Sequence, residues 1–301
     1  MSVDAVLIAG PTASGKSRAA LALAKAVGGV IVNADSMQVY REAPVLTAMP
    51  SGADRTAVPH LLYGHVSVRE PYSTGRYQDD AKRALAEARR MGKLPIFTGG
   101  TGLYFSVLTV GISDIPKVPA EIRARVRARY EEIGVAALHA ELASRDPETA
   151  STLRPSDPQR VMRAFEVFEA TRRPLAHWQG EMGKPVLDGF KLARFVMDAP
   201  RPELRGRIET RFKAMLGEGA LQEAAALRGL DPALPAAKIL GLRELWAIQD
   251  GALSEAEAVD LAVTATRQYA KRQLTWFRNR MADWDRLDSH NAADIITKVA
   301  S

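Results

Sequence analysis

The stretch that decides the fold is Gly10-Pro11-Thr12-Ala13-Ser14-Gly15-Lys16-Ser17. It follows the apolar run 6–9 and opens a helix-like segment that reaches residue 27. A buried strand, a glycine-rich turn and a helix start in this order form a P-loop, which points backbone N–H groups and a helix N-terminus at a phosphate. We expect Lys16 to bridge the phosphate oxygens and the Ser17 hydroxyl to bind Mg²⁺. The motif leaves open whether the phosphate belongs to a nucleoside triphosphate or to another diphosphate.

Length and composition limit the class of protein. The 301 residues are enough for one large or two ordinary domains, and with 47% hydrophobic residues the chain can bury a substantial core. No cysteine is present, which excludes disulfides, thiolate zinc sites and cysteine nucleophiles and agrees with a reducing compartment. Apolar runs stay short of the ~18 residues of a membrane span, and the chain has no signal-like start, so we expect a cytoplasmic protein without membrane contact. The formal charge of +6 favours a polyanionic partner, although basic composition alone is weak evidence.

Hydrophobic patterning divides the chain into three regions. The first, up to about residue 111, alternates apolar runs with helical segments, as a nucleotide-binding sheet does. The second consists of charged, alanine-rich helical segments broken by prolines. The third resumes the strand pattern at 191–197. We therefore predict an α/β fold, with a P-loop NTPase-like parallel sheet flanked by helices formed by residues 1–113 and 189–301, and an all-helical insertion at 114–188.

The individual elements follow from the same patterns. Strands are expected at 5–9, 30–32, 94–98 and 191–197. Helices are expected at 17–27, 77–91, 202–216, 221–227 and 253–280. The last dozen residues show no readable pattern.

Polar residues follow two of the predicted strands, at the edge where a parallel sheet binds its ligands. Asp35 lies in the segment Asn33-Ala34-Asp35-Ser36, directly after the second strand. It fits a site residue and, equally well, a turn or helix N-cap aspartate. Residues 98–102 read Thr-Gly-Gly-Thr-Gly, and these glycines allow the backbone to approach a ligand closely, although an ordinary strand-to-helix turn has the same pattern.

Two groups of basic residues are candidates for contact with a polyanion. Arginines recur at 123, 125, 127 and 129, but only pairs four residues apart share a helix face, so most of this run fits a solvated helix. Arg267, Lys271 and Arg278 fall within about 40° of one another on the last long helix, and this stripe has the geometry to follow a phosphate backbone. The neighbouring aromatic residues Trp276 and Phe277 are of a kind that more often packs in the core than stacks on bases.

The ordered set of motifs resembles the bacterial tRNA dimethylallyltransferases (tRNA isopentenyltransferases), and the resemblance covers nearly the whole chain. These enzymes prenylate the adenosine immediately 3′ of a tRNA anticodon. Departures are small: Leu242 stands where the family usually has tyrosine, and Phe165 where it usually has leucine. The absence of cysteine means that the zinc-finger extension of eukaryotic members is missing. The motifs that carry the resemblance lie at residues 10–17, 33–40, 99–104, 157–164, 207–211, 266–273 and 275–278.

The resemblance implies a reaction and the residues that perform it. Dimethylallyl diphosphate is the implied donor, whose diphosphate leaves an allylic carbon as the exocyclic N6 of adenine attacks. Asp35 is the implied general base, and Lys16, Thr101 and Arg207 complete the implied catalytic set by stabilising the leaving oxygens. Mg²⁺, held partly through Ser17, is the implied cofactor. The implied diphosphate-binding residues are Gly10, Thr12, Ala13, Ser14, Gly15, Lys16 and Ser17.

The resemblance also implies how the tRNA binds. The target base leaves its stack and enters a pocket, where polar groups read its edge. The helical insertion is expected to bind the anticodon stem-loop, and we expect the protein to be a monomer. The implied tRNA contacts are Asp35, Ser36, Met37, Gln38, Thr101, Arg123, Gln159, Arg160, Val161, Met162 and Arg163.

Two other classes of protein share part of this pattern. A small-molecule P-loop kinase has the same loop and uses ATP, but it does not require the segments at 159–163 and 267–273. A non-catalytic P-loop RNA-binding protein, such as a GTPase-like switch, needs a guanine-reading motif such as Asn-Lys-x-Asp, which the sequence lacks.

Overall fold

The computed structural model describes residues 3–180, 182–288 and 294–300. Contacts divide the chain into two compact units, one formed by Met1–Thr109 with Val186–Ser301 and the other by Val110–Pro185. The junctions predicted from the sequence, 113/114 and 188/189, lie four and three residues after the observed ones. The change in amino-acid composition on which the prediction rested comes slightly later in the chain than the change in contacts. Among the described residues, none of the helices is both long enough and apolar enough to cross a membrane.

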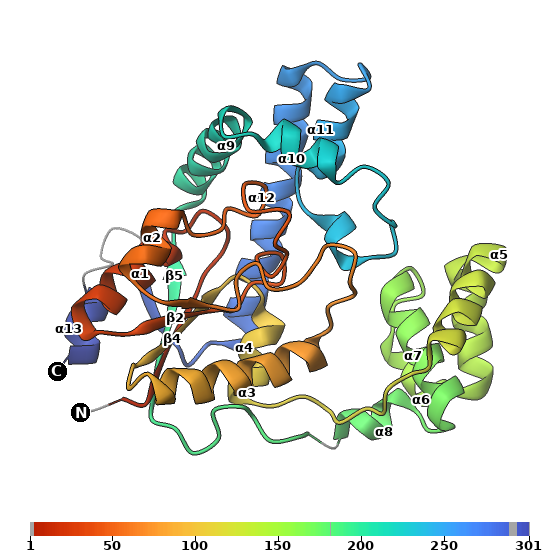
Figure 1. Cartoon of the computed structure of the whole chain (residues 1–301). Helices are drawn as coiled ribbons and strands as arrows, with labels where there is room; N and C mark the ends of the chain where they lie inside the picture. The colour runs from red at the N-terminus through yellow and green to blue at the C-terminus, as the bar shows by residue number, and fades with distance from the viewer. Residues whose placement is uncertain (1–2, 181, 289–293, 301) are drawn as a thin grey trace. The chain divides into compact units, whose positions relative to one another are not determined.

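The first unit is built on a six-stranded sheet (Figure 1). The predicted strands are observed at β1 (Ala5–Ala9), β2 (Val30–Asn33), β4 (Pro95–Gly99) and β5 (Leu192–Asp198). The strand order is β3-β2-β4-β1-β5-β6, and every neighbouring pair is parallel. The predicted parallel sheet is therefore confirmed, and its carboxyl ends all meet at one edge.

The sequence missed the two strands at the edges of the sheet. β3 (His60–Leu61) has two residues, and β6 (Asp285–Asp288) has a single buried side chain, Leu287, among exposed charged neighbours. Segments this short and polar carry too little apolar alternation to be recognised as strands. A charged, short edge strand also discourages pairing with another chain.

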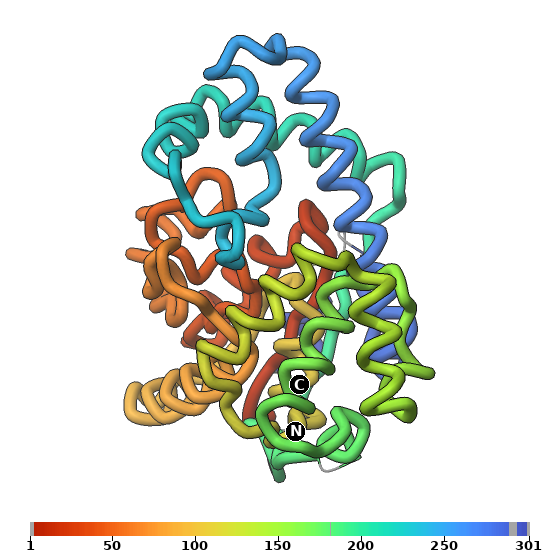
Figure 2. Tube along the Cα trace, turned by 90° about the vertical axis from the view of Figure 1, so that its right-hand side faces the viewer, coloured from red at the N-terminus to blue at the C-terminus, as the bar shows by residue number. Residues whose placement is uncertain are grey.

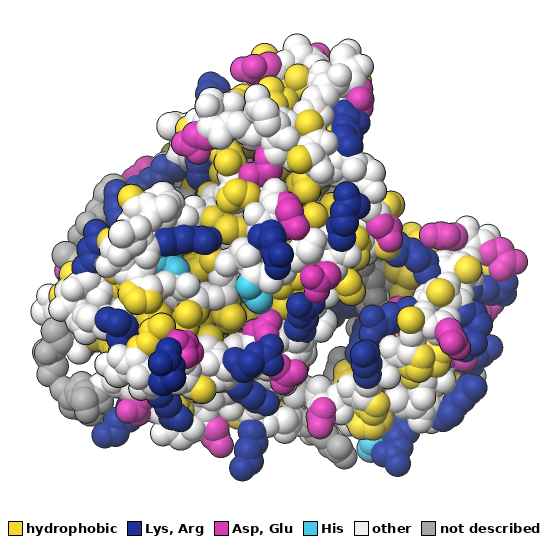
Figure 3. Space-filling view, viewed as in Figure 1, with side chains coloured by type: hydrophobic (Ala, Val, Ile, Leu, Met, Phe, Trp, Pro, Cys, Tyr) yellow, Lys and Arg dark blue, Asp and Glu magenta, His cyan; other side chains and the backbone are white. Residues whose placement is uncertain are grey.

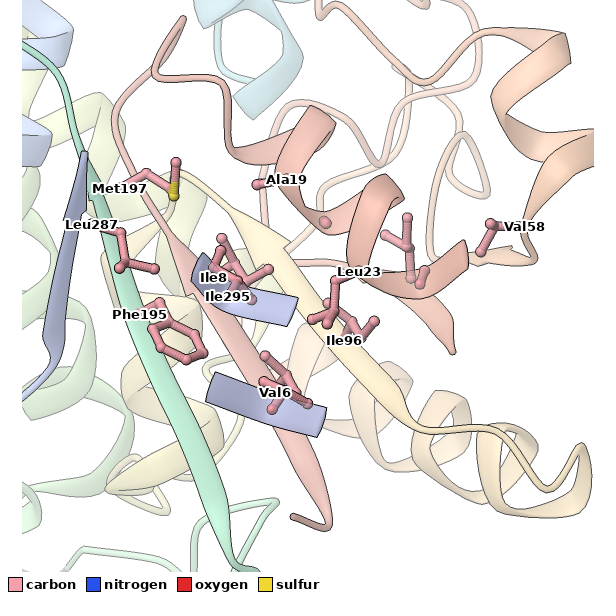
Figure 4. Close-up of a cluster of buried hydrophobic side chains, with 14 of the residues drawn as sticks. Val6, Ile8, Ala19, Leu23, Val58, Ile96, Phe195, Met197, Leu287 and Ile295 are labelled. Carbon is pink, nitrogen blue, oxygen red and sulfur yellow. The ribbon is translucent and has the colours of Figure 1, made fainter. Parts of the chain in front are cut away.

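One face of the sheet is covered by α1 (Lys16–Val27) and α13 (Asp294–Ala300). Successive strand residues point to opposite faces, so Val6 and Ile8 of β1 share this side and pack against Leu23 of α1 (Figure 4). Each large apolar side chain buried in this cluster stabilises the fold by about 1.5–3 kcal/mol. α13 lies in the stretch where the sequence showed no readable pattern.

The opposite face is covered by α3 (Thr74–Arg90) and α4 (Gly102–Thr109), which contact β2 and β1 (Figure 1). The rings of Tyr77 in α3 and Tyr104 in α4 stack with their centroids 3.7 Å apart. The Tyr77 hydroxyl donates a hydrogen bond to the Asn33 carbonyl at the end of β2 (3.2 Å). This bond ties the helical layer to the carboxyl edge of the sheet.

A further group of helices follows β5, and Figure 2 shows the longest of them, α12, in blue. α12 (Glu255–Arg280) packs against α9 (Arg201–Gly217) and α11 (Leu242–Gln249), and it begins with a capping box between Ser254 and Glu257. The helix α11 was not predicted from the sequence, because its eight residues span only about two turns. This unit also contains α2 (Gly52–Ala57), α10 (Ala220–Ala226) and the 3₁₀ turn Pro235–Lys238.

The second unit is helical, as predicted. Its helices are α5 (Ala120–Arg145), α6 (Pro147–Thr152), α7 (Pro158–Thr171) and α8 (Leu175–Gly180).

The surface of this second unit carries both signs of charge. Figure 3 shows Lys and Arg side chains interspersed with Asp and Glu on its visible face. Arg125 pairs with Glu169 at 3.0 Å, and Arg129 pairs with Glu141. The arginine run of α5 therefore behaves largely as the predicted solvated helix, and the structure adds ion pairs to it.

Candidate active site at the carboxyl edge of the sheet

The P-loop joins β1 to α1 and folds tightly against its own backbone. The Gly10 N–H donates to the Gly99 carbonyl at the end of β4 (3.3 Å), and the Ser14 N–H donates to the Pro11 carbonyl (3.2 Å). A Cβ at position 10 would lie 2.6 Å from Ser14 Oγ, so the loop needs glycine there. Gly15 adopts φ 86°, a left-handed conformation that favours glycine. The two glycines of the motif thus have separate steric reasons.

The start of α1 presents hydrogen-bond donors that an anion can use. Gly15 is the N-cap and provides no side-chain cap, so the first-turn N–H groups have no partner within the helix. A helix N-terminus of this kind favours negative charge. Ser14 Oγ is buried and has no hydrogen-bond partner among the described residues, while Ser17 is exposed in the first turn. These groups suit a phosphate and a cation that accompanies it.

Lys16 folds back over the loop. Its Nζ donates to the Pro11 carbonyl at 3.1 Å. Burial lowers the pKa of Lys16 to about 8, the Asp35 carboxylate partly opposes this, and the Arg211 guanidinium lowers the pKa further. The ammonium is therefore poorly solvated before a ligand arrives, and an anion that replaces the Pro11 carbonyl would stabilise it.

Asp35 is held by a hydrogen-bonded turn that follows β2. The fully buried Asn33 donates from Nδ2 to the Asp35 carbonyl (2.9 Å) and accepts from the Asp35 N–H (2.8 Å). Asp35 Oδ1 in turn accepts from the Met37 N–H (3.0 Å). Asp35 therefore acts as a turn aspartate through its Oδ1, as one of the two interpretations of the sequence expected. The second oxygen, Oδ2, would lie 3.1 Å from a Cβ on Gly100, and Asp35 lines an open pocket.

The loop after β4 brings Thr101 against the Asp35 turn. The Thr101 N–H donates to the Ala34 carbonyl (3.2 Å), and Thr101 Oγ1 accepts from the Ser36 N–H (2.9 Å). This approach is possible because a Cβ on Gly99 would lie 2.1 Å from the carbonyl carbon of Ala34. The glycines after β4 thus serve the contact between two loops.

Tyrosines surround the Asp35 carboxylate. Burial raises the pKa of Tyr63, Tyr104 and Tyr269, and the negative charge of Asp35 raises each pKa further. These hydroxyls therefore stay neutral at physiological pH. Tyr269 lines the same pocket as Asp35.

Arg211 is a site residue that the sequence reasoning did not select. It extends from α9, and its Nη2 donates to Thr12 Oγ1 of the P-loop at 2.5 Å. Burial lowers its pKa and Asp35 opposes that shift, and both residues line the same pocket. Arg207, the residue selected from the same helix, pairs instead with Glu203 at 3.0 Å. One helical turn separates the two arginines, so the shared motif could not distinguish them.

Gln273 is a second residue that the sequence reasoning passed over. It is buried in α12, where its Oε1 accepts from the Thr12 N–H (2.9 Å) and its Nε2 donates to the Gly100 carbonyl (2.8 Å). One side chain thus fixes both the P-loop and the loop after β4. The motif at 266–273 contains Gln273, but it does not show that Gln273 lies on the buried face of the helix.

A pocket opens beside these groups, and its walls differ in character. Thr12, Asp35 and Arg211 form a polar end. The rest is largely apolar, which suits a ligand that joins an anionic head to a hydrocarbon chain. The apolar lining residues are Met37, Leu46, Ile208, Phe212, Met215, Ile239 and Leu240.

The remaining expected residues lie in the helical unit. Gln159 and Arg160 are exposed in the first turn of α7, Met162 and Arg163 are half-buried, and Arg123 is exposed on α5.

Val161 departs from the expectation. Its side chain has no exposed surface and packs in the core of the helical unit, so it is not available to a ligand. The family segment is contiguous in sequence, but on a helix one of its members faces inward.

The lowered pKa of Lys16 predicts a pH dependence of anion binding. We expect the affinity for methyl diphosphate to fall as the pH rises through about 8, because only protonated Lys16 attracts the anion. Calorimetric titration across this range measures the affinity, and Lys16→Met should lower it by roughly ten- to a hundredfold and remove the decline. Lys25→Met, on the exposed face of the same helix, is the control and should retain it. A decline that persists in Lys16→Met contradicts the assignment.

The geometry also predicts unequal roles for the two arginines of α9. Arg211→Ala should weaken methyl diphosphate binding by roughly ten- to a hundredfold, because a charged donor beside the P-loop is lost. Arg207→Ala removes an ion pair at 3.0 Å with Glu203 and should change the affinity by less than about threefold. The same titration measures both variants. Equal losses, or a larger loss for Arg207→Ala, would contradict the unequal roles, and an unchanged affinity in Arg211→Ala would show that Arg211 is not an anion ligand.

Two family models match the chain. The model for IPP transferase matches residues 38–280, and the model for isopentenyl transferase matches residues 3–57. A tRNA dimethylallyltransferase of Bradyrhizobium sp. is 53% identical over 292 residues, which covers 96% of this chain and 95% of the relative. The tRNA dimethylallyltransferase of Rhizobium meliloti is 47% identical over 293 residues, covering 96% of this chain and 97% of the relative.

Solved structures agree with these matches. A tRNA isopentenylpyrophosphate transferase from Bacillus halodurans has a TM-score of 0.69 at 32% identity and covers 99% of this chain and 96% of its own. A eukaryotic dimethylallyltransferase acting on tRNA has a TM-score of 0.81 at 27% identity, covering 96% of this chain and 74% of its own. Sequence and structure thus match over both units, and the chain belongs to the IPP transferase family.

Proposed function

We propose that this chain transfers the dimethylallyl group from dimethylallyl diphosphate to the exocyclic N6 of the adenosine immediately 3′ of a tRNA anticodon, releasing diphosphate. The observation that carries the proposal is the composition of one pocket. Its polar end joins Thr12 of the P-loop, Arg211 and Asp35, and most of its other lining residues are apolar. A prenyl diphosphate has both characters, and relatives that match nearly the full chain are named for this reaction.

The P-loop would hold the diphosphate. The free N–H groups at the start of α1, the Lys16 ammonium and the Arg211 guanidinium are placed to stabilise the oxygens as the allylic C–O bond breaks. Mg²⁺ fits beside the exposed Ser17 hydroxyl, and it would neutralise part of the diphosphate charge. Among the described residues no cluster of His, Asp and Glu could hold a metal by itself, and a P-loop site needs none because phosphate oxygens and water supply the other ligands.

Asp35 is the group placed to accept a proton. The exocyclic amine of adenine is a weak nucleophile, and a carboxylate that orients its N–H and takes the proton assists C–N bond formation. Asp35 Oδ1 is occupied by the Met37 N–H, so Oδ2 is the atom available to the amine. The surrounding tyrosines, whose pKa values are raised, are held neutral and do not compete as bases. Thr101 also supports this turn, because its Oγ1 accepts a hydrogen bond from the Ser36 N–H.

The tRNA contacts remain those that the family resemblance implies. Arg123, Gln159, Arg160 and Arg163 of the helical unit have exposed or half-exposed side chains, as contacts to an anticodon stem-loop require. In the first unit, Lys271, Arg272 and Arg280 line an open groove along α12 together with Trp276, which suits a phosphate backbone and a base.

The alternative functions have less support. A small-molecule kinase would not need an apolar pocket beside the P-loop. A GTPase-like RNA-binding switch would not need a carboxylate with a free oxygen at the polar end of that pocket. Neither alternative accounts for full-length relatives named as dimethylallyltransferases.

The chemistry predicts the effect of Asp35→Asn. Incubation of the wild type with unmodified tRNA, dimethylallyl diphosphate and Mg²⁺, followed by mass analysis of nucleosides, should show dimethylallyl adenosine. In Asp35→Asn the single-turnover rate should fall by about 10²–10⁴-fold, while tRNA affinity changes by less than about tenfold. Asp79→Asn, at an exposed position of α3, is the matched control and should be unaffected. Absence of the product with wild type overturns the proposed function, and an active Asp35→Asn overturns only the base assignment.

The helical unit predicts a change in salt dependence. Arg160→Ala combined with Arg163→Ala should flatten the dependence of tRNA affinity on salt by roughly 1.4–1.8 in slope, because two phosphate contacts are lost. Lys82→Ala combined with Arg90→Ala removes the same charge from the exposed side of α3 and should leave the slope unchanged. Filter binding across a salt series measures both. An unchanged slope in the first variant excludes these arginines as phosphate contacts.

A further inference from the structure

One apolar wall of the pocket is a short turn between β2 and α2. Leu46 and Thr47 of this turn line the pocket. The turn is wound like a piece of helix, because the Thr47 N–H donates to the Ala43 carbonyl (3.1 Å) and the Ala48 N–H donates to the Val45 carbonyl (2.9 Å). Such a turn leaves N–H groups free at its start and carbonyl groups free at its end.

Glu223 of α10 satisfies the start of this turn. Its Oε2 accepts from the Val45 N–H at 2.9 Å, and its Oε1 accepts from the Leu46 N–H at 2.8 Å. This is the arrangement of a helix N-cap, supplied by a residue 178 positions away in the sequence. Burial raises the pKa of the half-buried Glu223, and the two backbone N–H groups oppose the shift.

Gln38 satisfies the end of the same turn. Its Nε2 donates to the Thr47 carbonyl (3.0 Å) and to the Ala48 carbonyl (2.7 Å). Ala48 adopts φ 52°, a left-handed conformation that costs energy for alanine and persists only where the surroundings hold it. The turn is therefore clamped at both ends. The resemblance implies that Gln38 contacts tRNA, but in this structure both donor hydrogens of its Nε2 bind the turn that forms the pocket wall.

We infer that Glu223 is a positioning residue for the donor pocket: by capping Val45 and Leu46 it fixes the apolar wall that sets affinity for, and chain length of, the prenyl group. The inference rests on the proposed function for the identity of the donor. Without the carboxylate, the two part-buried N–H groups lose their acceptors, and the turn gains by rearranging so that water can replace them. Leu46, which is 7% exposed, then no longer holds its place.

The test compares Glu223→Gln with Glu218→Gln. Both changes remove one carboxylate and keep the size, but Glu218 is exposed at the end of α9. In Glu223→Gln the side chain has one acceptor oxygen in place of the two that accept from the Val45 and Leu46 N–H groups. We expect faster hydrogen exchange at the Val45 and Leu46 amides and a roughly tenfold higher KM for dimethylallyl diphosphate, with kcat changed by less than about threefold. We also expect the preference for dimethylallyl over geranyl diphosphate, as a ratio of kcat/KM, to fall by about tenfold. Glu218→Gln should match the wild type in all three measurements.

Leu46→Ala tests the wall without touching the cap. It should lower the preference for the shorter donor while leaving exchange at Val45 unchanged. Unchanged exchange in Glu223→Gln overturns the capping contact. Faster exchange with unchanged KM and unchanged chain-length preference overturns the positioning role, as does a Leu46→Ala variant with wild-type preference. A wild type that transfers no prenyl group is the separate failure of the proposed function, and the exchange experiment still decides the capping contact in that case.

Discussion

The close approach of three loops at the carboxyl edge of the sheet is the constraint on which the site depends. The loop after β4 touches the P-loop through the Gly10 N–H and touches the Asp35 turn through the Thr101 N–H. Gly99 allows this, because any side chain there would occupy the space of the Ala34 carbonyl. Gln273 closes the arrangement by bonding to the P-loop and to the loop after β4. The P-loop and the Asp35 turn are thereby held together by hydrogen bonds to backbone groups of all three loops.

The charges at this edge favour an anionic ligand, because two cations, Lys16 and Arg211, stand beside one carboxylate, Asp35. Lys16 and Arg211 lie close enough to lower the Lys16 pKa, and burial lowers the pKa of both cations. Asp35 opposes both shifts but is shared between them. A diphosphate would restore what burial removes, because charged groups in a poorly solvated site gain most from a paired opposite charge. The protein thus holds Lys16 and Arg211 in place although burial separates them from water, and an anionic ligand would supply the interactions that water does not.

The sequence predicted those parts of the site that are encoded locally, and it missed those that are encoded by distant contacts. The P-loop and Asp35 could be recognised because strand, turn and helix are adjacent in the chain. Arg211 meets Thr12 across 199 residues and Gln273 meets it across 261, so the motifs that contain these two residues do not show which of their members reaches the P-loop. The inward face of Val161 was equally invisible in a contiguous motif. Motifs report that a segment belongs to a site, while the helical period and the tertiary contacts decide which of its residues reach that site.

The two ends of the pocket have different physical tasks, and the reaction requires both. Burying a five-carbon prenyl chain contributes on the order of 4 kcal/mol at about 0.8 kcal/mol per carbon. The apolar wall therefore adds to the affinity for the donor and limits the length of chain that fits. In the proposed complex the diphosphate would lie at Lys16 and the chain against Leu46, on either side of the reacting carbon. A wall can select chain length only if it is rigid, and a turn capped at both ends by side chains meets that requirement.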